Sequence, residues 1–245
     1  MLLMAVLALI FVPIPMLGIE ILLGANFLLS VLLFVTSALL AEKCRLYIAQ
    51  AALCFCAIAI GVAIATTRTF LTTKDFMQQL FLARTIGQWI CRENAVLGIM
   101  STFGASAAVI IFCREVPYKV AETAGRFCLD MMGTKSFAID QELNQGRITQ
   151  EEARTKREIL KQEAEGYSAL DGTTKCLGGT INAFVWIFAA SILGNFGVGV
   201  LECDLFWKDA FRQSAILSCG YLALQIPPLL FTSAALFLQC RNTKL

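Results

Sequence analysis

Long apolar runs almost free of ionisable side chains constrain this chain more than any other feature of its sequence. Four of them cover residues 21–40, 46–67, 95–113 and 177–201. Each holds about 20 residues, the length at which an α-helix crosses a hydrocarbon core of roughly 30 Å. Inside a bilayer every backbone polar group must be satisfied within the protein, which favours helices. The pattern predicts an all-α, polytopic transmembrane helical bundle.

Two further runs and one amphipathic stretch set the number of spans. Residues 215–238 form a fifth run that contains Pro227 and Pro228, which a packed membrane helix tolerates. Residues 2–17 are shorter and contain prolines, and we interpret them as a retained first helix that makes a tight hairpin with the next. Residues 70–90 are amphipathic and are expected to lie on the membrane surface or to enter it as a re-entrant pair. We therefore expect about six spans, and up to eight.

Composition excludes several function classes. The chain of 245 residues has 20 Lys and Arg against 18 Asp and Glu, a net charge of +2, so no basic field would attract nucleic acid. It lacks histidine, the commonest general base and metal ligand. Its ten cysteines contain no C-x-x-C pair; they are interpreted as small apolar residues, or as including one redox or structural pair. We expect no catalytic residues, no metal and no cofactor, and the protein is not expected to be an enzyme.

The distribution of Lys and Arg predicts an orientation in the membrane. Residues 114–176 hold ten basic residues, and the C-terminal tail adds Arg241 and Lys244. Both segments are expected on the cytoplasmic side of a bacterial inner membrane, which divides the chain into N-terminal spans (1–113), a cytoplasmic loop (114–176) and a C-terminal hairpin with a tail (177–245). Residues 68–94 disagree, since parity places them outside although they carry four basic residues.

The cytoplasmic loop is predicted to contain two helices. Pro117 suits the first turn of one helix, along which Lys119, Glu122, Arg126 and Asp130 are spaced to form one charged stripe. Thr149 and Glu152 are typical of a capping box, which predicts a second helix ending near residue 165. The charges have two interpretations, a solvated surface or an ion-paired face important for gating.

Three blocks of this loop closely resemble a signature of known proteins. They read KVAETAGRFCLD (119–130), AIDQELNQG (138–146) and EEARTKREILKQEAEGYSALDGTTK (151–175). The flanks agree, with VPIPMLGIEILLGANFLLS (12–30), ATTR (65–68) and QIPPLL (225–230). The chain resembles the membrane half of the type III secretion export-gate family, FHIPEP.

The resemblance implies a gating subunit of a flagellar or injectisome export apparatus in the bacterial inner membrane. It implies a homo-oligomeric, nonameric ring working beside other membrane subunits and an export ATPase, and a large soluble domain beyond the membrane half. The ion-pair and gating candidates it selects are Lys119, Glu122, Arg126, Asp130, Asp140, Asp171 and Lys175, and the intramembrane polar candidates are Glu20, Asn26 and Gln225. A carboxylate such as Glu20 is costly in a membrane and has a partner or a task.

Departures from the family pattern bear on proton coupling. The resemblance places Thr180 and Gly220 where the family has acids, and Ala59 and Ala63 where it has Arg and Asn. None of these side chains titrates, so the family's usual proton route is not expected here. Two alternatives to an export gate are an unrelated secondary transporter or channel, and a truncated or degenerate family member without export activity.

Overall fold

The structure is built from long helices. The computed structural model describes residues 11–12, 14–39, 45–72, 80–92, 94–201 and 206–241, and within these ranges it contains helices and no strand. The all-α prediction is confirmed. The helices are α2 (Met16–Leu39), α3 (Arg45–Thr72), α4 (Phe81–Cys91), α5 (Ala95–Asn144), α6 (Gln150–Leu201) and α7 (Trp207–Arg241).

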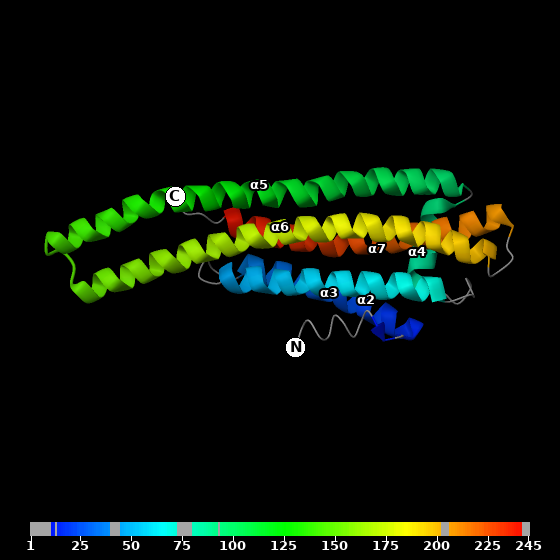
Figure 1. Ribbon diagram of the computed structural model, residues 1–245, viewed down its shortest axis with the longest axis horizontal. Helices are drawn as coiled ribbons and strands as arrows, with labels where there is room; N and C mark the ends of the chain where they lie inside the picture. Colours follow the sequence, from blue (N-terminus) through cyan, green and yellow to red (C-terminus); the bar gives the residue numbers. More distant parts are fainter. Residues whose placement is uncertain are drawn as a thin grey trace.

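Five of these helices run side by side as a bundle (Figure 1). Each of α2, α3, α5, α6 and α7 is long and apolar enough to cross a membrane, in agreement with the five predicted runs. Helix α7 is the central element, since it contacts α2, α3, α4, α5 and α6. The predicted first helix, residues 2–17, falls mostly outside the described residues.

Polar side chains join the helices inside the bundle. The buried face of α2 alternates apolar residues with Asn26, Ser30 and Ser37. Ser37 Oγ donates to the Ala235 carbonyl at 2.6 Å, and Gln239 Nε2 donates to the Ser37 carbonyl at 2.7 Å. Hydrogen bonds between small and polar residues are a main source of cohesion where lipid removes the hydrophobic drive for helix association.

Helix α5 corrects the prediction that Pro117 opens a separate helix. The helix runs unbroken from Ala95 to Asn144 with Pro117 inside it. A proline there removes the hydrogen bond to the carbonyl four residues earlier, that of Cys113. Ser233 Oγ of α7 donates to this carbonyl at 3.2 Å, so the freed acceptor is satisfied and the helix continues.

Helix α6 corrects the predicted end near residue 165, because it continues from Gln150 to Leu201. At 1.5 Å per residue, α5 and α6 are each at least about 75 Å long, far more than a bilayer core requires. Figure 1 shows their joined ends projecting beyond the other helices as a hairpin. The predicted loop is therefore a direct extension of two spans.

The tip of the α5–α6 hairpin is closed by local signals that the sequence predicts. The capping box is confirmed, since the Thr149 N–H donates to Glu152 Oε2 at 2.8 Å and the Glu152 N–H donates to Thr149 Oγ1 at 3.3 Å. Gly146 turns the chain with φ of 69°, a left-handed conformation that glycine adopts freely. Ile139, Ala153 and Leu160 form a small buried cluster behind the turn.

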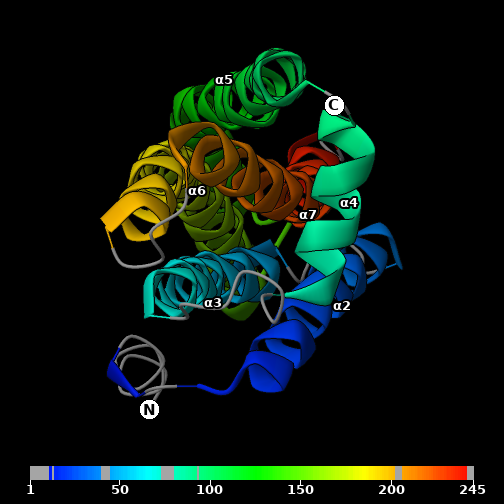
Figure 2. The same cartoon turned by 90° about the vertical axis from the view of Figure 1, so that its right-hand side faces the viewer.

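Helix α4 lies across the bundle. Figures 1 and 2 show it roughly perpendicular to the long helices, at the end opposite the hairpin tip. Its small buried residues, Ala83, Gly87 and Cys91, recur every four positions and form one face, and α4 packs mainly against α7. Of the amphipathic stretch 70–90, the first residues complete α3 and the last form α4, while 73–79 lie outside the described residues.

The Pro117–Ser233 relation predicts a compensating pair of substitutions. Ser233→Ala removes the donor to the Cys113 carbonyl and is expected to cost about 0.6 to 1.5 kcal/mol of unfolding free energy. Pro117→Ala restores a backbone N–H for that carbonyl and should recover most of this loss in the double variant. Denaturant titration of the purified chain in mixed micelles measures both, and additive losses would contradict the relation.

The capping box predicts a pH dependence at the hairpin tip. The hydrogen bond from the Thr149 backbone N–H, followed by the Thr149 side chain, holds the pKa of Glu152 below its usual value. A depressed carboxyl pKa gives stabilisation that is present above the ordinary glutamate pKa of about 4.3 and lost as the pH falls through the folded-state value. Amide exchange at residues 150–153, corrected for intrinsic rates, should therefore lose protection on acidification.

Glu152→Gln should lose most of this pH dependence, because the amide stays neutral throughout. Glu151→Gln, a neighbouring exposed acid in the same turn, is the matched control and should keep it. Equal pH dependence in wild type and Glu152→Gln would assign the effect to another group.

Candidate functional site

A groove between α5 and α6 gathers part of the predicted charged set. It lies where the hairpin leaves the bundle and encloses about 270 Å³. The residues that line it come from both long helices: Glu122, Gly125, Arg126, Cys128 and Leu129 from α5, and Ala164, Tyr167, Ser168, Asp171 and Lys175 from α6.

Two ion pairs face this groove, one on each helix. Arg126 Nη2 lies 2.6 Å from Glu122 Oε1, and Lys175 Nζ lies 2.7 Å from Asp171 Oδ2. Both are i,i+4 pairs, which follow from the helical repeat. The other Asp171 oxygen, Oδ1, is inaccessible to solvent and accepts no hydrogen bond from the part of the chain that the structure describes. A carboxylate in that position is sensitive to small movements of the helices around it, because desolvation without a full set of donors is costly.

A buried cation ties α3 to the same region of α6. The Arg45 side chain, at the start of α3, lies with its guanidinium carbon 4.4 Å from the centre of the Tyr167 ring. Both residues are buried, with 5% and 3% of their surface exposed. A cation over an aromatic face gains about 2 kcal/mol when desolvated. A Cβ atom at Gly166 would meet the Arg45 Cβ at 3.4 Å, an ordinary van der Waals contact, so α3 and α6 pack closely here.

The remaining predicted charges lie outside the groove. Lys119 pairs with Glu115 at 3.4 Å, one turn earlier on α5. Asp130 is exposed and makes no ion pair within the described ranges. Asp140 pairs across the hairpin with Arg157, close to a second cross-hairpin pair between Lys156 and Glu142 at 2.6 Å. The predicted stripe thus divides between the groove, the surface of α5 and the hairpin tip.

Each of the three intramembrane polar candidates, Glu20, Asn26 and Gln225, lies in a different environment in the structure. Glu20 Oε1 accepts a hydrogen bond from the Phe81 backbone N–H at 2.6 Å, so it satisfies a donor at the N-terminus of α4. Gln225 is buried in α7 and donates to the Tyr221 hydroxyl at 3.1 Å. Asn26 is buried in α2, and its Oδ1 accepts no hydrogen bond from the described residues.

The positions that depart from the family pattern are packed tightly. Thr180 is buried, and its hydroxyl donates to the Cys176 carbonyl at 3.0 Å. Gly220 lies where α4 crosses α7: a Cβ atom there would overlap the carbonyl oxygen of Ala83. Gly87 meets α7 in the same way, against the Ile216 carbonyl. A side chain at position 220 is therefore incompatible with this crossing.

Sequence reasoning missed the Arg45–Tyr167 contact and the α4–α7 crossing. The signal for the first was an arginine at the edge of a span together with the Gly-Tyr pair inside a signature block. The signal for the second was one glycine in each helix, Gly87 in α4 and Gly220 in α7. Neither signal shows from the sequence alone which residue it will contact. Among the described residues, no three His, Cys, Asp or Glu side chains are grouped as metal ligands. The chemical groups that the groove offers are two ion pairs and a carboxylate oxygen that is shielded from solvent.

Comparison with known proteins gives consistent matches over the whole chain. The family model described as FHIPEP family matches residues 6–244. Similar curated proteins include the hypersensitivity response secretion protein HrcV of Ralstonia nicotianae, 30% identical over 96% of this chain and 34% of its own length. The flagellar biosynthesis protein FlhA of Helicobacter pylori is 30% identical over 98% of this chain and 33% of its own length, and FlhA of Bacillus subtilis is 27% identical over 94% and 34%. The chain spans about a third of the length of these relatives, and no solved structure matches it significantly.

The α4–α7 crossing predicts an unequal response to glycine substitution. Gly220→Ala should reduce the free energy of unfolding by about 1 to 3 kcal/mol, because the two helices must separate to admit the methyl group. Gly104→Ala is the matched control, since a Cβ atom at that position of α5 meets nothing within 4 Å, and it should leave stability unchanged or slightly raised. Thermal unfolding of both variants in the same detergent compares them, and equal stability would contradict the close crossing.

Proposed function

Because this chain belongs to the FHIPEP family, we propose that it forms the membrane part of an export-gate subunit in a type III protein secretion apparatus. The observation that carries the proposal is the family match over residues 6–244. The five-span bundle with its ion-paired hairpin supports it, because it gives the signature blocks one continuous structure. The relatives include both flagellar and hypersensitivity response proteins, so the proposal covers both kinds of apparatus.

The proposed location is the bacterial inner membrane, with the hairpin and the C-terminus on the cytoplasmic side. The ten basic residues of 114–176 support this orientation through the positive-inside rule. The end of α7 lies toward the hairpin side of the bundle (Figure 1), so the two segments can share one compartment. We expect the subunit to assemble into a homo-oligomeric ring with other membrane components of the apparatus and to work beside an export ATPase. The three segments 1–113, 114–176 and 177–245 remain the proposed division of the chain. Helix α5 crosses the boundary between the first two segments without a break, and α6 crosses the boundary between the last two.

The groove is proposed to couple the hairpin to the bundle. Its pairs, Glu122–Arg126 and Asp171–Lys175, lie on two facing helices, and Arg45 links α6 to α3 directly beside them. A change in the angle between α5 and α6 would alter the surroundings of the buried Asp171 oxygen first. Such a change would supply the difference in interaction free energy that a shift between two states of a gate needs.

Proton coupling through the family's usual acid positions is not proposed for this chain. Thr180 holds no proton charge near neutral pH, and Gly220 is closed by the α4–α7 crossing. Glu20 already satisfies the start of α4. An unrelated transporter or channel, the other class considered for this topology, is disfavoured by membership of the family.

The test of the proposed role is a charge exchange within the groove. Asp171→Asn should lower export by about fivefold, the ratio that corresponds to about 1 kcal/mol in a two-state equilibrium, because it removes the negative charge that pairs with Lys175. Asp171→Lys combined with Lys175→Asp restores an i,i+4 pair and should recover part of the export. The readout is secretion in a strain that depends on this gene, with the amount of protein in the membrane measured in parallel.

Two matched variants complete the design. Glu158→Gln removes a carboxylate from an exposed i,i+4 pair on the same helix, with Arg154 at 3.4 Å, and should not change export. Asp130→Asn tests the remainder of the predicted stripe and should have a smaller effect than Asp171→Asn. Normal export by Asp171→Asn, at an equal protein level, would favour the alternative interpretation, in which the groove charges only form a solvated surface.

A further inference from the structure

Two cysteines meet where α4 crosses α7, at the end of the bundle opposite the hairpin (Figures 1 and 2). Cys91 is the last residue of α4 and Cys219 lies on α7. Both are free thiols in the structure, and they are hydrogen-bonded to each other. Both are buried, with 3% and 0% of their surface exposed. This contact is a candidate for the redox or structural pair that the sequence allows.

The two sulfur atoms also pack against one turn of α5. A Cβ atom at Gly98 would overlap the Cys91 sulfur, and the Cys219 thiol is hydrogen-bonded to the Thr102 side chain. Thr102 is itself fixed, since its hydroxyl donates to the Gly98 carbonyl at 2.7 Å. Three helices therefore hold the pair together.

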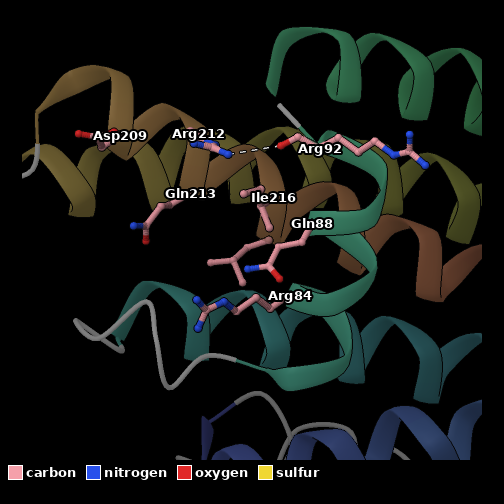
Figure 3. Close-up of a pocket in the computed structure, with 8 residues that line it drawn as sticks. Arg84, Gln88, Arg92, Asp209, Arg212, Gln213 and Ile216 are labelled. Atoms are coloured by element: carbon pink, nitrogen blue, oxygen red, sulfur yellow. Dashed lines mark hydrogen bonds between the residues drawn. The ribbon is translucent and has the colours of Figure 1, made fainter. Parts of the chain in front are cut away.

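The close crossing of α4 and α7 brings their backbones together around this pair. Gly87 and Gly220, each within one turn of one of the cysteines, are positions where a Cβ atom would overlap the backbone of the other helix. Just beyond the pair, Arg212 of α7 donates to the Arg92 carbonyl at 3.4 Å, beside a cavity of about 610 Å³ between the two helices (Figure 3). A disulfide needs Cα atoms about 4.4 to 6.8 Å apart, and backbone contacts on both sides of the pair favour such a separation.

The pair lies at the membrane face that the proposed orientation places outside the cytoplasm. Cys91 precedes the apolar run that starts at residue 95, and Cys219 lies near the start of the run 215–238. Disulfides form and persist in oxidising compartments such as the bacterial periplasm. Contact between the thiols and an oxidising compartment therefore coincide at this pair.

A second pair of cysteines provides an internal comparison. Cys56 of α3 and Cys176 of α6 are also hydrogen-bonded to each other. Cys176 is exposed and ends the segment that is proposed to be cytoplasmic. Cytoplasmic thiols are kept reduced, so the two pairs share a contact between thiols and differ in compartment.

We propose that Cys91 and Cys219 form a disulfide bond in the cell, which fastens α4 covalently to α7 at the periplasmic face. The proposal rests on the proposed orientation of the chain. The oxidant is the disulfide of a periplasmic thiol oxidase. The Cys91 thiolate attacks one sulfur of that disulfide and releases the other as a thiolate, and the Cys219 thiolate then attacks the Cys91 sulfur and releases the second. The cysteine pair thus loses two electrons and two protons, which the two sulfur atoms of the oxidant accept.

The surroundings of Cys91 suit it to the first of these steps. The hydrogen bond from Cys219 lowers the pKa of the Cys91 thiol below its usual value, against the effect of burial, and the charge of Arg212 adds to the lowering. The thiolate is the nucleophile in such an exchange. Because both sulfur atoms are buried in the finished bundle, the exchange takes place as α4 docks against α7, and the bond is then shielded from reductants.

The experiment reads the redox state of each cysteine in the full chain, expressed in a bacterial inner membrane. Free thiols are alkylated in acid-quenched, denatured cells, and the protein is digested without reductant. Mass spectrometry should find the peptides of Cys91 and Cys219 joined in most of the protein, and Cys56 and Cys176 alkylated. A host that lacks its periplasmic thiol oxidase should accumulate the first pair in the alkylated form.

Thermal unfolding of the purified chain measures what the bond contributes. Reduction by a small phosphine should lower the unfolding midpoint of wild type by about 5 to 10 °C. Cys91→Ser combined with Cys219→Ser should unfold cooperatively near the midpoint of the reduced protein and should not respond to the reductant. Cys56→Ser combined with Cys176→Ser is the matched control and should keep the wild-type response.

Three results would overturn the proposal. One is alkylation of both Cys91 and Cys219 in wild type from cells with an active oxidase. Another is a disulfide that joins either residue to a different cysteine. The third is a bond between Cys56 and Cys176 in place of this pair, which would also reverse the proposed orientation. The readout is redox state and not secretion, so the export role is tested separately by Asp171→Asn.

Discussion

The requirement that backbone polar groups find partners inside an apolar bundle governs this structure. Pro117 frees the carbonyl of Cys113 in the middle of α5, and Ser233 of α7 supplies the missing donor. Ser37 and Gln239 join α2 to α7 by the same chemistry. In lipid an unsatisfied group costs several kcal/mol, so these few side chains decide which helices are neighbours. The central position of α7 follows, because it contributes to most of these contacts.

Features that depend on local sequence could be predicted. Span positions follow from length and the absence of charge, the capping box from residues three apart, and the pairs Glu122–Arg126 and Asp171–Lys175 from the helical repeat. The continuity of α5 could not be predicted, because the rule for proline is local whereas the donor to the freed Cys113 carbonyl is Ser233, 120 positions further along the chain from Cys113. The ion pair between Asp140 and Arg157 could not be predicted for the same reason, because it depends on how the hairpin folds back on itself.

The departures from the family pattern gain a physical explanation from packing. Comparison with the family pattern alone would describe Gly220 as a position from which an acidic residue has been lost. In the structure it is the residue that lets α4 approach α7, paired with Gly87 on the opposite helix. The same crossing brings Arg84 and Arg212 to one cavity. The glycine at position 220 thus stands where the family pattern has an acid, and it permits the crossing that forms this cavity.

The unbroken course of α5 connects the hairpin tip directly to the bundle. Pro117 divides the helix into one arm of about 33 Å within the bundle and another of about 40 Å that reaches the hairpin tip, at 1.5 Å per residue. A proline is where a long helix bends most easily, whereas α6 contains none. A sideways load on the hairpin tip therefore bends α5 first at Pro117, whereas α6 carries the load into the bundle as one continuous rod.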